Sequence, residues 1–137
     1  MRKSWGLTKK ILTGEKKIES RWYKSRYPPW DKIKEGETVY FKDSGDPVTI
    51  KTIVDKVIQF SNLTPDKVRE ILNKYGKEDG LGIDEIPKFF KMFKDKKYCV
   101  LVFLRDVQRI KPFNIDKTGF GLMSAWLIIE DVNKIKI

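Results

Sequence analysis

The chain has 137 residues, of which 40% are hydrophobic and 35% are charged, and it carries a net charge of +10. These values indicate one globular domain over residues 1–137, and no apolar run approaches the roughly 20 residues of a membrane span. With no histidine and a single cysteine, the sequence excludes His-based catalysis, His-ligated metals, an internal disulfide and a Cys-based metal cage. The first residues lack a signal-peptide pattern, so we expect a cytoplasmic protein. We also expect no membrane partner, no metal and no cofactor.

The positive charge is concentrated near the N-terminus. Residues 1–27 contain nine Lys or Arg and two acids, a net +7, which leaves +3 for residues 28–137. This asymmetry favours a polyanionic partner, because Lys and Arg gain affinity by releasing counterions from phosphates. The alternative is a Lys-rich solvated surface, as in some thermophilic proteins.

The first third of the chain predicts a short helix followed by strands. Residues 8–13 favour a helix that ends at Gly14, and residues 16–23 alternate as in a strand. Residues 27–30, Tyr-Pro-Pro-Trp, predict a loop, because proline cannot donate to a central ladder. Residues 37–42 and Val48–Phe60 are rich in residues that favour strands. The alternation of the first strand places Lys17, Glu19 and Arg21 on one face and Lys16, Ile18 and Ser20 on the other.

Two helices and further strands follow. Thr64 and Pro65 predict a helix start and Gly76 its end. A second helix opens at Asp84 with an apolar stripe of phenylalanines, and residues 97–110 form a strand that residues 111–113 break. Residues 119–121 predict a turn, and residues 125–130 predict the last strand. The order indicates an α+β fold with a short N-terminal helix and two helices inserted between strands.

Residues 14–21 read Gly-Glu-Lys-Lys-Ile-Glu-Ser-Arg, a G-x-K-x-x-E-x-R pattern, and residues 34–39 read Lys-Glu-Gly-Glu-Thr-Val. Both segments resemble the signature of ASCH domains in the PUA-like superfamily. The resemblance covers most of residues 7–60 and, more loosely, residues 98–110. It implies a small PUA-like β-barrel with a mixed, largely antiparallel sheet, and a basic cleft lined by Lys16, Glu19 and Arg21. Members of this family are proposed to bind RNA.

Some small members of the family are amidohydrolases that act on acetylated cytidine. In those proteins the motif carries a threonine nucleophile where this sequence has Glu19. The lysine position matches at Lys16, and the nucleophile position does not.

The three motif side chains also suggest chemistry of their own. Lys16 offers a compact charge for a phosphate or carbonyl oxygen, and Arg21 offers a planar fork for bidentate contacts. Glu19 can accept hydrogen bonds from a base edge, or act as a general base toward water if it is partly buried. The alternative is that Glu19 simply pairs with Arg21 or Lys17 on a strand face.

Aromatic residues alternate with cations after the motif. Trp22, Tyr23, Tyr27 and Trp30 lie among basic residues, an arrangement that suits stacking on bases, although we expect at least one of the four in the core. The glycines at positions 119 and 121 would bring Ser124 and Trp126 to the cleft rim. Cys99 is expected to be a buried, inert thiol. The predicted ligand-binding residues are Lys16, Lys17, Glu19, Arg21, Trp22, Lys24, Arg26, Tyr27, Trp30, Ser124 and Trp126.

Three functions fit the sequence. The first is a module that binds RNA or a nucleotide-like ligand in the basic cleft. The second is a small hydrolase, acting on a modified nucleoside or on RNA, in which Lys16 orients the substrate and Glu19 activates water. The third is a protein-interaction domain for an acidic partner.

Overall fold

The computed structural model describes residues 7–26, 30–42 and 45–114. In this part of the chain, helices and strands follow one another as the sequence predicts for an α+β fold. The elements are α1 (Leu7–Thr13), β1 (Ile18–Tyr23), β2 (Thr38–Phe41), β3 (Val48–Phe60), α2 (Pro65–Tyr75), the 3₁₀-helix η2 (Ile83–Glu85), α3 (Ile86–Phe93) and β4 (Tyr98–Phe113).

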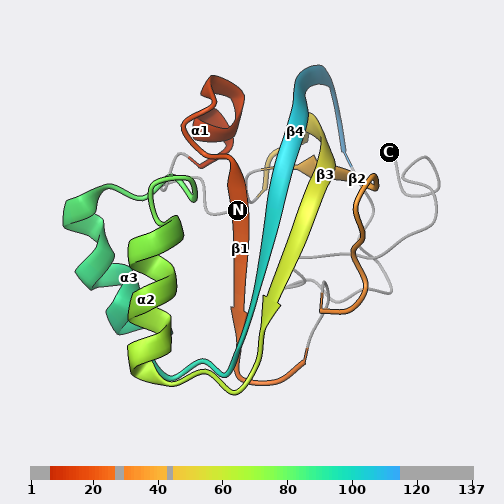
Figure 1. Ribbon diagram of the computed structural model, residues 1–137. Helices are drawn as coiled ribbons and strands as arrows, with labels where there is room; N and C mark the ends of the chain where they lie inside the picture. Colours follow the sequence, from red (N-terminus) through yellow and green to blue (C-terminus); the bar gives the residue numbers. More distant parts are fainter. Residues whose placement is uncertain (1–6, 27–29, 43–44, 115–137) are drawn as a thin grey trace.

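The strands form one antiparallel sheet in the order β1-β4-β3-β2 (Figure 1). The helices α2 and α3 are inserted between β3 and β4, which are neighbours in the sheet, and lie beside β1 (Figure 1). In the described residues the sheet is open between β1 and β2. The predicted strand 125–130 lies outside these residues, so closure into a barrel stays a prediction.

Each face of the sheet covers a separate hydrophobic core. On one face, residues of β1 and β4 pack against α2 and α3. This helix-side core contains Ile18, Trp22, Leu63, Val68, Ile71, Leu72, Phe89, Cys99 and Leu101. On the other face, the α1-side core contains Ile11, Ile33, Val39, Phe41, Ile50, Val54, Val100 and Val102. The sheet therefore separates two environments, and a residue of β1 faces one or the other according to its parity.

Capping residues account for the position of α2. The Thr64 side chain accepts a hydrogen bond from the Lys67 backbone N–H at 3.2 Å, and Pro65 occupies the first helical turn. Such a cap contributes about 1 kcal/mol to helix stability. The second helical segment begins with η2 at Ile83, one residue before the predicted start at Asp84.

The predicted break at residues 111–113 is wrong, because β4 continues to Phe113. Its pairing with β3 explains why Pro112 is tolerated. Phe113 pairs with Val48 and Arg109 pairs with Ile50, so three residues of β4 lie opposite one residue of β3. Proline is accepted at such irregular positions because no regular ladder hydrogen bond is lost there.

None of the helices in residues 7–26, 30–42 and 45–114 is long and apolar enough to cross a membrane.

Candidate functional site

Strand β1 carries the motif and divides its side chains between the two faces of the sheet. Glu19, Arg21 and Tyr23 lie opposite Val102, Val100 and Tyr98 of β4, on the side of the α1-side core. Ile18 and Trp22 belong to the helix-side core. The predicted alternation is confirmed. We call the face that carries Glu19, Arg21 and Tyr23 the motif face.

Glu19 is the most deeply placed charge of the motif face. It is 5% exposed, and its Oε1 lies 3.5 Å from Arg21 Nε. Its second oxygen, Oε2, is buried and accepts no hydrogen bond from any residue that the structure describes. Burying a carboxylate oxygen without a donor is unfavourable, so buried polar atoms are nearly always paired. An unpaired one therefore marks a place where a ligand group can bind.

Tyr23 stands next to this pair along the strand. Burial raises the pKa of its phenol, the Arg21 guanidinium lowers that pKa, and the Glu19 carboxylate raises it. The net direction is upward. The phenol is therefore protonated at neutral pH and provides a hydroxyl donor beside the ion pair.

Aromatic rings form the rim of the motif face after β1 ends. Trp30 packs edge-on against Tyr98, with ring centroids 5.1 Å apart. The Arg26 guanidinium lies 5.8 Å from the centroid of the same tyrosine ring. Tyr98 is paired with Tyr23 in the sheet, so the rim is continuous with the row of motif side chains.

The loop that carries Trp30 is fastened to the sheet. The Asp31 backbone N–H donates to Gln59 Oε1 at 2.7 Å, and Gln59 Nε2 donates to Asp31 Oδ1 at 2.8 Å. Gln59 pairs with Val100, which pairs with Arg21. The two hydrogen bonds therefore fasten the loop to β3, at the position that is in register with Val100 of β4 and Arg21 of β1.

On the other side of β1, Lys16 is enclosed in a buried cluster. Lys16 and Asp79 are 3% and 6% exposed. The Lys16 ammonium donates to the Asp79 carboxylate and, at 2.8 Å, to the Asp79 backbone carbonyl. Ser20 Oγ donates to Asp79 Oδ2 at 2.6 Å. Each charged group of this cluster therefore has partners within the chain.

The cluster ties β1 to the loop that follows α2. Backbone N–H groups of Lys17 and Ile18 donate to the Glu78 carbonyl at 2.6 and 3.0 Å, and Lys10 Nζ donates to the Gly80 carbonyl at 2.7 Å. Gly80 has φ +83°, and a Cβ there would lie 3.1 Å from Lys16 Cβ. Glycine thus permits both the backbone turn and the close approach to Lys16.

Electrostatics link the two sides of β1. Burial raises the pKa of Asp79, the Lys16 ammonium opposes that rise, and the Glu19 carboxylate adds to it. Asp79 therefore contacts Lys16 directly and is also influenced by Glu19 through the strand.

Comparison with solved structures adds a fold assignment. The crystal structure of ASCH from Zymomonas mobilis is 20% identical in sequence, covers 98% of this chain and 88% of its own, and has a TM-score of 0.65. A mutant of the same Zymomonas mobilis protein is 20% identical, with coverages of 98% and 91% and a TM-score of 0.66. This chain has the ASCH-domain fold. The hypothetical protein PH0355 is also similar, at 21% identity, coverages of 80% and 94%, and a TM-score of 0.53.

No protein-family model matches the sequence, and neither does any curated protein. At these identities the structural likeness establishes the fold and not the ligand.

The ASCH fold brings some predicted site residues together and separates others. Glu19 and Arg21 share the motif face, and Arg26 and Trp30 contact Tyr98 at its rim. Lys17 and Lys24 are exposed. Lys16 is on the opposite side with Asp79, and Trp22 is a core residue that stacks on Phe93 at 5.0 Å. Tyr27, Ser124 and Trp126 lie outside the described residues.

Several residues of the site were not among the predicted ligand-binding residues; three of them, Asp79, Tyr98 and Gln59, lie outside β1 and the segment just before it. Asp79 lies in a loop and the other two lie on strands, so their proximity to the motif depends on strand pairing across long sequence separations. The alternation of β1 places Trp22 on the face of Ile18 and away from Glu19, so the prediction of Trp22 as a ligand-binding residue is wrong, because Trp22 is a core residue.

Cys99 is fully buried in the helix-side core of this ASCH fold. Burial raises the pKa of its thiol well above the usual range, and the Asp79 carboxylate raises it further. The thiol is therefore protonated and inert at neutral pH, as the sequence indicated.

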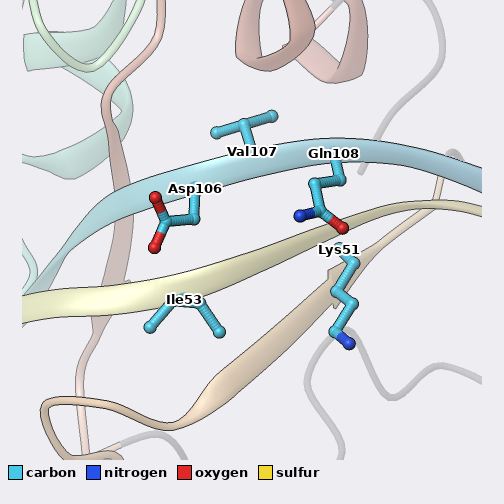
Figure 2. A pocket seen from close by; sticks show the side chains of 5 residues that line it. All are labelled: Lys51, Ile53, Asp106, Val107 and Gln108. Atoms are coloured by element: carbon cyan, nitrogen blue, oxygen red, sulfur yellow. The ribbon is translucent and has the colours of Figure 1, made fainter.

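A shallow hollow lies away from the motif, on the paired strands β3 and β4 (Figure 2). It is lined by Lys51, Ile53, Asp106, Val107 and Gln108. Asp106, at φ +52°, occupies a bulge between the pairs Lys51–Gln108 and Ile53–Arg105.

Within the described residues, no group of three or more acidic or cysteine side chains is arranged to hold a metal ion.

Proposed function

We propose that this ASCH-fold chain binds RNA or a nucleotide-like ligand on the motif face. The observation that carries this proposal is the Glu19–Arg21 pair, in which Glu19 is buried and its Oε2 has no hydrogen-bond donor in the described part of the chain. A buried carboxylate oxygen without a hydrogen-bond donor is unfavourable for stability. A ligand that donates a hydrogen bond to Glu19 would remove that penalty.

The surroundings of the pair suit a nucleic-acid ligand. Lys24 and Arg26 are exposed after β1, where they can neutralise phosphates. Trp30 and Tyr98 form an aromatic rim on which a base can stack. The net charge of +7 over residues 1–27 adds a favourable long-range field.

The proposal includes the finer architecture that the family resemblance implies. The sheet would close into a PUA-like barrel, and the motif face would then line a basic cleft. Ser124 and Trp126 would contribute to its rim. We further propose a cytoplasmic protein, in agreement with its single cysteine.

RNA binding measured by fluorescence anisotropy over a salt series tests this function. The double variant Lys24→Ala/Arg26→Ala removes two exposed cations beside the rim. We expect weaker binding and a fall of about 1.4 in the log–log salt slope, at about 0.7 for each lost phosphate contact with a single strand.

The matched control is Lys91→Ala/Lys94→Ala, which removes two exposed cations at the end of α3, on the side of the helix-side core. It has the same net charge as the test variant and should bind RNA as the wild type does. Equal losses in the two variants would show that only net charge matters, and no binding at low salt would reject the proposal. The chain would then be tested against acidic proteins, the partner class of the protein-interaction alternative.

The hydrolase alternative draws support from the same unpaired oxygen, because a buried carboxylate with a free oxygen can serve as a general base. The enclosure of Lys16 by Asp79 argues against Lys16 as a substrate contact. Assay of modified nucleosides and RNA for hydrolysis, with Glu19→Gln as the inactive variant, decides this alternative. Turnover that survives in Glu19→Gln would exclude Glu19 as the base.

A further inference from the structure

The chemical character of the ligand group at Glu19 can be taken from the atoms around it. The Glu19 oxygens differ: Oε1 lies 3.5 Å from Arg21 Nε, while Oε2 is buried without a donor among the described residues. The flanking positions across the sheet are apolar, since Glu19 pairs with Val102 and Val102 pairs with Val57. The group without a partner is therefore one hydrogen-bond acceptor, Glu19 Oε2, and the neighbours of Glu19 across the sheet are apolar.

Such an acceptor discriminates among the groups that a nucleotide can present. A phosphate or a carbonyl oxygen would place negative charge or a lone pair against Oε2 and be repelled. A hydroxyl or an N–H group would satisfy it, and a hydrogen bond to a carboxylate is stronger than one between neutral groups. Nucleobases differ in whether a given ring position carries an exocyclic amino group, which donates, or a carbonyl oxygen, which accepts. Glu19 Oε2 can bind the amino group and not the carbonyl.

Arg21 and the rim restrict the ligand further. The Arg21 guanidinium, 17% exposed in its side chain, stands two residues along β1 and can donate to a ring nitrogen or carbonyl. Trp30 and Tyr98 lie at the end of the same row, where a ring can stack. An amino group flanked by an acceptor, on a flat ring, fits these contacts.

We propose that Glu19 determines base specificity: its Oε2 accepts a hydrogen bond from the exocyclic amino group of a nucleobase, so the site prefers amino-bearing bases to their carbonyl counterparts. This inference rests on the proposed binding of RNA or a nucleotide at the motif face. It adds which edge of the ligand is recognised and by which atom.

Two pairs of ligands compare an amino group with a carbonyl at the same ring position; within each pair the adjacent ring nitrogen also changes from an acceptor to an N–H donor. Oligocytidine and oligouridine differ at the pyrimidine position that bears an amino group or a carbonyl, and oligoadenosine and oligoinosine differ in the same way on a purine. We expect the wild type to bind the amino member of at least one pair about tenfold more tightly, from one hydrogen bond to a charged group. Glu19→Gln, which keeps the shape and supplies a donor, should bring that ratio close to one.

Lys24→Ala is the control for a side chain whose charge acts on phosphates and does not read bases. Lys24 is exposed beside the rim, so this variant should bind both members of a pair more weakly and leave their ratio unchanged. Stacking predicts a different pattern, in which both purines bind more tightly than both pyrimidines and Glu19→Gln changes nothing.

The outcomes separate this inference from the function on which it rests. If no oligonucleotide binds, the proposed function fails. If RNA binds with the salt dependence expected above but the amino and carbonyl members bind equally, or if Glu19→Gln keeps the wild-type ratio, the function stands and the role of Glu19 is overturned. Circular dichroism of Glu19→Gln verifies that the variant is folded before its ratio is interpreted.

Discussion

The two sides of β1 hold two ion pairs, one fully and one partly buried, whose hydrogen bonds are satisfied to different degrees. On the side of α2, Lys16 and Asp79 pair with each other, and Ser20 supplies a further hydrogen bond to Asp79. On the motif face, Glu19 and Arg21 approach only to 3.5 Å, and one Glu19 oxygen has no donor within the described residues. Lys16, Glu19 and Arg21 belong to one short motif, so the residue types of the motif alone do not tell the two pairs apart.

The difference teaches how a sequence motif can combine structure and recognition. A fully paired cluster stabilises one arrangement of the chain, here β1 against the loop after α2. An incompletely paired one leaves interaction energy available for a ligand. The motif therefore divides into Lys16 and Ser20, which pair with Asp79, and Glu19 and Arg21, which we propose to contact the ligand.

The largest expected effect is a loss of stability in Asp79→Asn. The substitution keeps the shape of the side chain but leaves the Lys16 ammonium buried without its counter-charge. Removing one partner of a buried ion pair lowers the free energy of unfolding by about 3–5 kcal/mol. Urea unfolding followed by tryptophan fluorescence measures this change.

The double variant Lys16→Met/Asp79→Leu removes both charges and is the control. It should be clearly more stable than Asp79→Asn, because an apolar pair can replace a buried ion pair at little cost. If Asp79→Asn unfolds like the wild type, the cluster does not hold the fold, and the contrast between the two sides of β1 is lost.

A smaller effect on the free energy of unfolding is expected for Glu19→Gln. This isosteric change removes a buried charge that lacks a full set of donors, so the free energy of unfolding should stay within about 1 kcal/mol of the wild type or rise. The same urea titration compares it directly with Asp79→Asn. A loss as large as that of Asp79→Asn would show that the Glu19–Arg21 pair is structural.

Local signals in the sequence predicted most of the fold. The strand Val48–Phe60 was placed correctly, and α2 was placed by the Thr64 cap and Pro65 because these features act within one turn. The break expected at Pro112 failed for a non-local reason. Pairing of Val48 with Phe113 creates an irregularity in which proline is tolerated, and strand register cannot be read from local propensity.

The site was predicted in part for the same reason. Alternation along β1 was sufficient to separate Glu19 and Arg21 from Lys16 and Ser20. The partner of Lys16 was not predictable from local sequence, because Asp79 lies 63 positions away in sequence, in the loop that follows α2. The family resemblance predicts Lys16 in a shared cleft with Glu19, and that role stays a prediction; in the fold, Lys16 pairs with Asp79 on the opposite side of β1.

The smallest expected effect distinguishes the motif face by its response to alkaline pH. Because burial raises the pKa of Tyr23 in the folded chain, the native state holds the phenolic proton more tightly than the unfolded chain does. Stability from this group is thus complete below the unfolded pKa of about 10 and is lost as the pH rises through the folded pKa.

Tyr23→Phe cannot ionise there, so its free energy of unfolding should fall less between about pH 8 and about pH 11. Urea titrations at the two pH values measure the difference, with Tyr40→Phe on β2 as the control for losing a phenol elsewhere in the sheet. An equal fall in Tyr23→Phe and the wild type would mean that the Tyr23 phenol is not sheltered beside Glu19 and Arg21, and would make the motif face more open to water than its burial indicates.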